Sequence, residues 1–420
     1  MRKIVVIIGL VLMLVNCASQ PDIQKETIVL PDELYSQDTI KGDIICWENY
    51  KIPQLNRTRT IRIYLPPGYS DSNQSYPVMY MQDGQNVYND NFSVNGGWKV
   101  NDTIDSIVSA GLHRGIIVVA IDNSAYRVQE YVPYKFETAH MSSQQSQADA
   151  MSDFIVETLK PDIDNNFRTL TNIENTMISG SSFGSFLTIY TVLRHPGVFG
   201  KVGAFSTALS SWNVAKEFEE YILSSEDQNK TDWFFYVGKD ESSADSQLAF
   251  DAISKLSPNR IVHYIDPKGG HDEASWAASY RSALPWMLNI SNEIEPIWDG
   301  IRRDKGFYNS RGEFILGKPE LKGNSVKEGE ITFIYSGEGK NVVLAGDFSG
   351  WDATRNEFIM KKVDDHFEIT IPMKAGSYKY KYVIDDRWVS PSLILENMKP
   401  EPTDLVDDGF GGFNAVLVLE

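Results

Sequence analysis

One serine of this chain has the surroundings of a catalytic nucleophile. Residues 180–184 have the sequence GSSFG, with Ser182 at the centre. The apolar pair before them, at 177–178, predicts the end of a buried strand, and residues 186–193 predict a helix. A strand, a sharp glycine-flanked turn and a helix together expose a serine hydroxyl beside the free N–H groups of the helix. The pattern predicts Ser182 as a nucleophile, although an ordinary strand–helix turn has the same appearance.

A nucleophilic serine needs a base for its proton, a carboxylate that orients the base, and N–H donors for the oxyanion. The histidines of the chain are His113, His140, His195, His263, His271 and His366. His271 follows the strand predicted at 261–265, where the chain order serine, acid, histidine requires the base. His263 lies inside that strand, and His195 is expected to cap the helix that follows Ser182. We therefore predict His271 as the base.

The carboxylate is expected in the loop after the strand predicted at 233–238, between the nucleophile and the base in chain order. Asp240 and Glu241 are the candidates there, and Asp245 lies farther along. Acidic residues that are merely solvated in a loop would have the same sequence pattern. The residues alone therefore do not decide between Asp240 and Glu241.

The oxyanion is expected to bind two backbone N–H groups. One belongs to Phe183, the residue after the nucleophile. The other is expected in the turn that follows a short apolar strand at 77–81, at Gly84 or Gln85, because a glycine permits the tight backbone that such a donor needs. We expect neither a metal nor a cofactor for this chemistry.

The elements around these residues predict two folded regions. Continuous apolar strands alternate with helices up to about residue 292, which predicts a parallel sheet covered on both faces by helices. The predicted strands are 59–65, 77–81, 115–121, one that ends at 177–178, 202–206, 233–238 and 261–265. The predicted helices include 154–159, 186–193, 246–256 and 274–283. The first strand alternates apolar and polar residues and is expected to be half exposed. The helix at 154–159 is expected to end near Pro161.

The pattern changes in the C-terminal third. Residues 293–325 are charged and non-periodic and are predicted to be a linker. Short strands separated by turns rich in Gly, Asp and Ser follow, at 331–335, 341–345, 367–371, 378–383 and 415–418. They predict an immunoglobulin-like β-sandwich over 326–420.

The N-terminus has the features of a lipoprotein signal peptide. Two basic residues precede an apolar run at 4–15 that is too short to span a membrane, and the run ends in LVNC, which resembles a bacterial lipobox. We expect a signal peptide at 1–17, lipid on Cys17, a tether at 18–40, and a hydrolase domain at 41–292. The protein would then lie in the bacterial cell envelope, at the periplasm or the outer membrane, and contact the membrane only through its lipid.

Composition narrows the possible partners. The chain of 420 residues has a net charge of −18, which argues against nucleic acid or an anionic membrane surface as a partner and suits uncharged ligands. Cys17 and Cys46 are the two cysteines, so a cysteine-based metal site is excluded, and a lipid on Cys17 would exclude an intrachain disulfide. Cys46 is predicted to be a packed core residue.

Several segments together resemble the esterase branch of the α/β-hydrolases, which includes feruloyl, acetyl xylan and siderophore (enterochelin-type) esterases and S-formylglutathione hydrolase. The segments are 62–69 (RIYLPPGY), 76–78 (YPV), 82–86 (QDGQN), Arg127 with Glu130, Tyr131 and Pro133, the turn at 180–184, and 269–271 (GGH) followed by Trp276. The resemblance covers about residues 58–290. It implies an α/β-hydrolase fold with Ser182 as nucleophile, His271 as base and Glu241 as acid, with Asp240 in reserve. Ser185 departs from the family, which often has a glycine there.

The C-terminal region resembles the glycogen-binding, isoamylase-N-terminal type of carbohydrate-binding module (family 48). The matching segments are 343–351 (VLAGDFSGW), 376–383 (GSYKYKYV), Asp385, Trp388 and 411–416 (GGFNAV). The resemblance implies that Trp351, Lys381, Trp388 and Asn414 hold a sugar, whose C–H face packs on a flat indole ring. The alternative is that the tryptophans belong to the sandwich core.

These expectations combine into an exported carbohydrate esterase with an acylated polysaccharide or oligosaccharide as its partner. It would remove feruloyl or acetyl groups from a plant polysaccharide while the C-terminal module holds the glycan. One alternative is a catecholate siderophore esterase, for which a glycan-binding module has no use. Another is a non-catalytic glycan-binding lipoprotein, against which the intact set of Ser182, Glu241 and His271 argues.

Overall fold

The computed structural model describes most of the chain from Leu34 onward. The described residues are 34–35, 39–88, 97–134, 136–137, 142–143, 146–208, 212–225, 230–239, 244–256, 260–298, 306–308, 314–316, 321, 323–407 and 413–420. The predicted signal peptide, the lipid on Cys17 and most of the predicted tether lie outside them. Among the described helices, none is both long enough and apolar enough to cross a bilayer.

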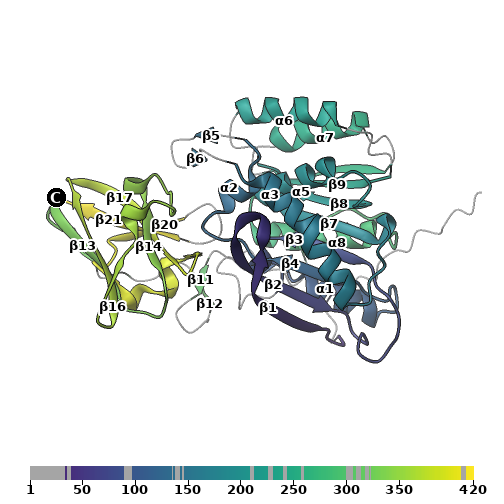
Figure 1. Cartoon of the computed structure of the whole chain (residues 1–420), viewed down its shortest axis with the longest axis horizontal. Coiled ribbons are helices and arrows are strands. Elements are labelled where there is room, and N and C mark those ends of the chain that lie inside the picture. Colours follow the sequence, from purple (N-terminus) through teal and green to yellow (C-terminus); the bar gives the residue numbers. More distant parts are fainter. Residues whose placement is uncertain are drawn as a thin grey trace, which may run out of the picture.

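The N-terminal domain is built on an eight-stranded sheet with the order β1-β2-β4-β3-β7-β8-β9-β10 (Figure 1). The strands are β1 (Asp43–Ile52), β2 (Arg57–Leu65), β3 (Val78–Gln82), β4 (Ile117–Ile121), β7 (Thr176–Ser181), β8 (Lys201–Phe205), β9 (Asp232–Gly238) and β10 (Ile261–Asp266). The pairs β1–β2 and β2–β4 are antiparallel and the other neighbours are parallel. The carboxyl ends of β7 to β10 therefore share one edge of the sheet.

Helices cover both faces of this sheet, as predicted. One face packs against α3 (Ala148–Asp153), α5 (Phe183–Arg194), α6 (Trp212–Ser224) and α7 (Ala244–Leu256). The other packs against α1 (Val100–Ser109) and α8 (Glu273–Met287). The fold class predicted for this domain is thus confirmed, although the sheet is mixed rather than wholly parallel, because β2 runs against its neighbours and the unpredicted strand β1 is added at its side.

The predicted half exposure of the strand at 59–65 is wrong. Within 59–65, Arg59, Arg62 and Tyr64 are buried like the apolar residues and Thr60 is half-buried, because neighbouring strands and the helices on both faces cover the strand. Arg62 is 5% exposed and its Nε donates to Asp122 Oδ1 at 2.8 Å, while Tyr64 is 1% exposed and donates to Asp105 Oδ1 at 2.7 Å. The polar residues that alternate with apolar ones in this strand therefore include side chains that bind buried carboxylates instead of facing solvent.

Two local predictions also need correction. Cys46 is exposed rather than packed in the core, because β1 is an outer strand of the sheet with mostly exposed side chains. The helix at 154–159 does not end near Pro161 but continues through α4 (Lys160–Asn166). Residues Phe154–Leu159 form a π-helix, in which each hydrogen bond spans one residue more than in an α-helix. This change in spacing comes just before Pro161, which has no N–H to donate.

The C-terminal domain is an all-β sandwich. One sheet has the order β15-β16-β13-β19, and the other has the order β14-β17-β21-β20 with β18 paired to β17. The strands are β13 (Gly329–Tyr335), β14 (Val342–Gly346), β15 (Lys361–Val363), β16 (His366–Met373), β17 (Gly376–Ile384), β18 (Arg387–Val389), β19 (Met398–Lys399), β20 (Asp404–Asp407) and β21 (Phe413–Leu419). Residues such as Phe333, Leu344 and Tyr380 form the core between the sheets, which confirms the predicted β-sandwich.

Between the domains, β11 (Gly306–Tyr308) and β12 (Phe314–Leu316) form a two-stranded hairpin inside the predicted linker. The predicted domain boundaries otherwise stay predictions. The two domains lie side by side (Figure 1) and are in contact, because the Ala125 N–H donates to the Asp386 carbonyl at 2.8 Å. Ala125 also packs against a small apolar cluster of the sandwich that includes Val383.

Candidate active site

The predicted turn at Ser182 is a strained elbow between a strand and a helix. β7 ends at Ser181 and α5 begins at Phe183, and Ser182 between them has φ 55° and ψ −126°. This backbone conformation is costly for any residue other than glycine, so the surroundings must hold it. One such restraint is the hydrogen bond from the Ser182 N–H to the Phe205 carbonyl, at 2.9 Å.

The two glycines of the motif are required by close packing. A Cβ on Gly180 would lie 2.5 Å from the carbonyl oxygen of Gly184, across the turn. A Cβ on Gly184 would lie 2.9 Å from Asp83 Oδ2 and 3.0 Å from the Cβ of Gln82. The second clash shows that the turn after β3 packs directly against the elbow. This is the turn predicted to supply the second oxyanion donor.

The backbone of that turn is also tightly constrained. Asp83 has φ 55°, and Gly84 is so close to the main chain of residues 120–122 that a Cβ would lie 2.7 Å from it. The Gln85 side chain accepts a hydrogen bond from the Asn123 N–H at 3.0 Å. These contacts give Gly84 and Gln85 a rigid setting, which a backbone donor to an oxyanion requires.

An ion pair supports this turn, and the motif analysis did not assign it a role. The guanidinium of Arg127, at the start of α2 (Arg127–Tyr131), donates to both carboxylate oxygens of Asp83 at 2.7 and 2.8 Å. Burial opposes the charge on Arg127, but Asp83 outweighs it and raises the pKa of the guanidinium. The arginine also lies 5.5 Å from the centre of the Phe183 ring. Arg127 therefore ties the turn at Asp83 to the elbow.

The loop that carries His271 is held at the end of β9 by three glycines. A Cβ on Gly238 would lie 2.4 Å from Gly269 C and Gly270 N, and a Cβ on Gly269 would lie 2.1 Å from the Tyr236 hydroxyl. The loop after β10 thus packs against the residue that ends β9. The predicted acids follow that residue, so the histidine loop and the acid loop start side by side.

A chain of contacts links His271 toward the elbow. Its ring packs edge-on against Trp276, with centroids 5.2 Å apart. The indole N–H of Trp276 donates to Ser206 Oγ at 2.8 Å, and Ser206 directly follows β8. Because β7, β8, β9 and β10 are parallel neighbours, Ser182 and His271 lie at the same edge of the sheet. The structure does not separate them to opposite edges, which would have removed the basis for a triad.

The predicted acids and the unusual residue Ser185 both follow the elbow in the chain. Asp240 and Glu241 lie outside the described residues, which stop at Lys239 and resume at Ala244. Ser185, the departure from the family pattern, is fully buried, and its hydroxyl hydrogen-bonds to the Thr207 hydroxyl at 2.7 Å. The extra hydroxyl is therefore satisfied inside the elbow packing.

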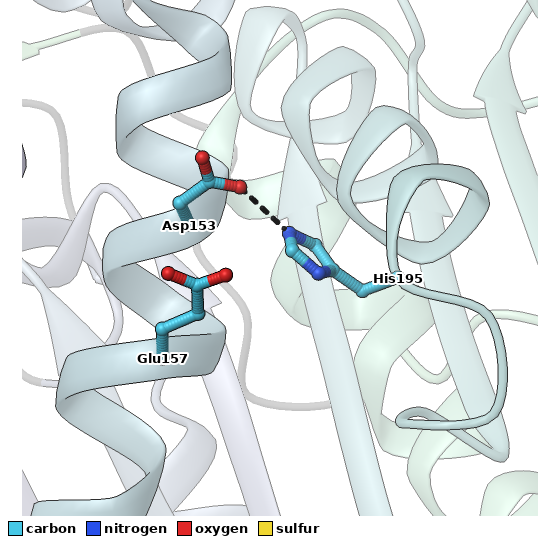
Figure 2. Close-up of side chains that lie close together, drawn as sticks. All are labelled: Asp153, Glu157 and His195. Atoms are coloured by element: carbon cyan, nitrogen blue, oxygen red, sulfur yellow. Dashed lines mark hydrogen bonds and ion pairs between the residues drawn. The ribbon is translucent and has the colours of Figure 1, made fainter.

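A second histidine lies in a cluster of charged groups away from the elbow. His195 caps the end of α5, as predicted, and its Nε2 lies 3.1 Å from Asp153 Oδ1, with Glu157 close by (Figure 2). Arg194 already binds both oxygens of Asp153, at 2.9 and 3.0 Å. Burial lowers the pKa of His195. A cation here would have to displace Arg194, so the geometry is that of an ion-pair network.

The four residues predicted to bind sugar come together on one part of the C-terminal domain. The rings of Trp351 and Trp388 lie 6.2 Å apart at 37°. Trp388 pairs across β18 and β17 with Val383, and Lys381 is on the same face of β17 as Val383, opposite the core residues Tyr380 and Tyr382.

Asn414 lies on that face too, because the next residue of β21, Ala415, points into the core opposite Tyr380. Within the part of the chain that the structure describes, the Asn414 side-chain oxygen is buried and has no hydrogen-bond partner. The two tryptophans are half-buried rather than sealed in the core between the sheets. We refer to Trp351, Lys381, Trp388 and Asn414 as the aromatic face.

The parallel sheet with a serine at a strand–helix elbow is the architecture of α/β-hydrolases. The chain belongs to the family described as "Putative esterase", whose model matches residues 52–287. It is therefore a serine esterase. A second model, described as the glycogen recognition site of AMP-activated protein kinase, matches residues 330–395, which makes a carbohydrate the partner indicated for the sandwich domain.

Two relatives illustrate the range of similarity. The uncharacterized protein YbbA of Bacillus subtilis is 23% identical over 251 residues, which cover 54% of this chain and 92% of YbbA. An endo-1,4-beta-xylanase/feruloyl esterase of Xylanibacter ruminicola is 29% identical over 154 residues, 36% of this chain and 20% of that protein.

Among solved structures, a ferulic acid esterase matches with a TM-score of 0.47 and 18% identity, covering 60% of this chain and all (100%) of that one. The enterobactin esterase of Shigella flexneri matches with a TM-score of 0.47 and 16% identity, covering 60% of each chain.

Proposed function

We propose that this chain is a carbohydrate esterase that removes acyl groups, feruloyl or acetyl, from a plant polysaccharide. Ser182 is the nucleophile, His271 the base and Glu241 the carboxylate that orients the base. The observation that carries the proposal is the strained elbow at Ser182, held by two glycines that tolerate no side chain, with the His271 loop at the same edge of the sheet.

The reaction has two steps in this proposal. His271 takes the proton of the Ser182 hydroxyl as the oxygen attacks the ester carbonyl, and the N–H groups of Phe183 and of Gly84 or Gln85 bind the oxyanion. The alcohol of the sugar leaves with the proton from His271, and the acyl group stays on Ser182. His271 then activates a water that releases the free acid and restores the serine.

The choice of substrate rests on the second domain and on one relative. A sandwich that matches a glycogen recognition model gives the enzyme a means to hold a glycan. The relative from Xylanibacter ruminicola combines xylanase and feruloyl esterase in its name. A siderophore esterase would need only the first domain, so the module favours the polysaccharide.

A panel of substrates tests the proposal. Methyl ferulate, acetylated xylan and enterobactin are offered to the wild type and to Ser182→Ala under the same conditions. We expect turnover of one of the first two by the wild type alone. Preferential turnover of enterobactin would establish the siderophore alternative. Equal rates of p-nitrophenyl acetate hydrolysis by wild type and Ser182→Ala would leave only a glycan-binding role.

We also propose that the protein is anchored in the bacterial cell envelope by lipid on Cys17. The support is the sequence of residues 1–17, with its basic start, apolar run and lipobox-like end. Metabolic labelling with a palmitate analogue tests this in cells. Label should enter the protein and be lost in Cys17→Ser, and label retained by that variant would contradict the anchor.

A further inference from the structure

A polar cavity of about 580 Å³ lies where the two domains meet. It is formed mainly by the hairpin of β1 and β2 with its turn at Pro53–Leu55, by the loop after β4, and by the turn between β17 and β18. The lining residues include Lys51, Arg57, Arg59 and Asp386. Its size is within the range of pockets that bind small molecules, about 300–1,000 Å³. None of the predicted catalytic residues lines it.

Three cations line this cavity in a chain whose net charge is −18. Arg59 is the most informative of them, because it is only 7% exposed. Its Nη2 donates to both oxygens of Glu130, at 2.7 and 2.8 Å. Its Nε, by contrast, has no hydrogen-bond partner among the described residues. A buried charged donor left without an acceptor is unfavourable unless something else binds it.

The other cations are positioned differently. Arg57 is held firmly, since its Nη1 lies 2.7 Å from both Glu130 Oε1 and Gln147 Oε1 and its guanidinium lies over the Tyr126 ring at 3.7 Å. Lys51, in contrast, is exposed at the rim on β1. The cavity thus combines two preorganised guanidinium groups with one adaptable ammonium group, a combination that suits a carboxylate.

The remaining lining is mixed, because Ile52, Pro53 and Tyr126 are apolar or aromatic and the other residues are polar. Asn56, Thr58 and Ser124 offer hydroxyl and amide groups, and Asp386 adds one carboxylate. A sugar suits this lining, because its hydroxyls bind the polar groups and its C–H face packs on an aromatic ring. Asp386 would repel a small bare anion but can accept a hydrogen bond from a sugar hydroxyl. This favours a ligand that carries both a carboxylate and hydroxyls.

The position of the cavity connects it to the aromatic face. Asp386 accepts the hydrogen bond from the Ala125 N–H, and Ala125 and Trp388 pack against the same apolar cluster of the sandwich. Trp388 itself lies two residues after Asp386. A glycan chain on the aromatic face would therefore pass close to the opening between the domains.

We propose that this interdomain cavity binds an acidic sugar, a uronic acid residue carried by the polysaccharide, with its carboxylate on Lys51 beside the guanidinium groups of Arg57 and Arg59. The choice of a sugar rests on the proposed function, but the binding site does not depend on the catalytic residues. The esterase would then select acidic regions of the polysaccharide through a site separate from its nucleophile.

Calorimetry on the full chain carrying Ser182→Ala tests the proposal without turnover. The probes are xylotetraose and the same oligosaccharide with one glucuronic acid branch. We expect the acidic probe to bind about tenfold more tightly, since hydrogen bonds to charged groups are stronger than neutral ones. Equal affinity for the two probes would overturn the proposal.

Lys51→Glu is the informative variant, because Lys51 is exposed and its replacement leaves the buried Arg59–Glu130 pair intact. It should remove the preference for the acidic probe and leave the affinity for xylotetraose unchanged. Lys374→Glu, an equal charge change at an exposed position that does not line the cavity, is the control and should keep the preference. The same loss in both variants would reduce the effect to overall charge and contradict the site.

The same two changes, made in the otherwise wild-type chain, separate this proposal from the proposed function. Hydrolysis of p-nitrophenyl acetate should be unchanged in both variants. If esterase activity is absent from the wild type but the acidic probe still binds preferentially, the cavity proposal stands and the catalytic one fails. If activity is present and the preference is absent, the reverse holds.

Discussion

The elbow and the aromatic face hold their predicted functional residues in different ways. At the elbow, Ser182 has positive φ, is 4% exposed and sits between glycines that admit no Cβ. On the aromatic face, Trp351 also has positive φ, 59°, but it lies in a turn beside a three-residue strand, and its indole N–H donates to Asp347 at 3.0 Å. The backbone at the elbow is therefore restrained by close packing on both sides of Ser182. Trp351 is restrained by a few local contacts.

This contrast agrees with the two kinds of chemistry that we propose for these regions. A covalent step depends on the placement of one oxygen to within fractions of an ångström, so the backbone around it must be held rigidly. A sugar ring packing on an indole depends on a flat, accessible surface, which tolerates small displacements. Changes at the elbow should therefore abolish a reaction, whereas changes on the aromatic face should weaken binding by degrees.

The largest effect is expected at the nucleophile and the base. Ser182→Ala and His271→Ala should each lower kcat for p-nitrophenyl acetate by at least about 10⁴-fold, because the two groups act as one unit. Ser181→Ala, at the neighbouring buried serine, should retain most of the activity. Thermal unfolding of all three variants checks that the fold is intact. Substantial activity in either of the first two would remove that residue from the mechanism.

The acid should show the next largest effect. Glu241→Gln is expected to lower kcat by about 10³-fold, because the imidazolium that forms on His271 loses its carboxylate partner. Asp240→Asn should change kcat by less than about threefold. Steady-state kinetics on a soluble ester measures both. The opposite order of effects would reassign the role to Asp240.

Crowding the elbow should have an intermediate effect. Gly184→Ala places a Cβ against Asp83 and Gln82, so we expect a loss of about 1–3 kcal/mol in the free energy of unfolding and a kcat about 10²-fold lower. Gly68→Ala is the matched control. It has φ 75° with no atom within 4 Å of the added Cβ, so it should cost about 1–2 kcal/mol of backbone strain and leave kcat unchanged. Loss of activity in both would show that stability alone, not elbow geometry, controls the rate.

The smallest effect should come from the aromatic face. Trp351→Ala is expected to weaken retention of the protein in a xylan or glucan affinity gel by about tenfold, since burial of an aromatic surface is lost. Hydrolysis of p-nitrophenyl acetate should not change. Unaltered mobility in every gel would mean that Trp351 has a structural role only, and the contrast between the two regions would then lose its functional meaning.

Local patterns in the sequence determined much of the fold. The G-x-S-x-G turn between an apolar strand and a helix predicted the elbow, because steric rules for glycine and the periods of strands and helices act over a few residues. The same reasoning found five sandwich strands, β13, β14, β16, β17 and β21, and missed the shorter strands β15, β18, β19 and β20. It failed where burial depends on a distant partner. β1 was not predicted, Cys46 was expected inside and is exposed, and Arg62 was expected in solvent and is paired with Asp122.

The sequence by itself therefore determined the candidates: the serine between two glycines, the histidine after the last strand of the first domain, and the tryptophans of the second domain. Only the tertiary structure decided which of them meet. The packing of Gly184 on Asp83, the support of that turn by Arg127, and the cavity around Arg59 all join residues 40 or more positions apart or on different domains. Such contacts depend on strand order and domain docking, which no local period or turn preference encodes.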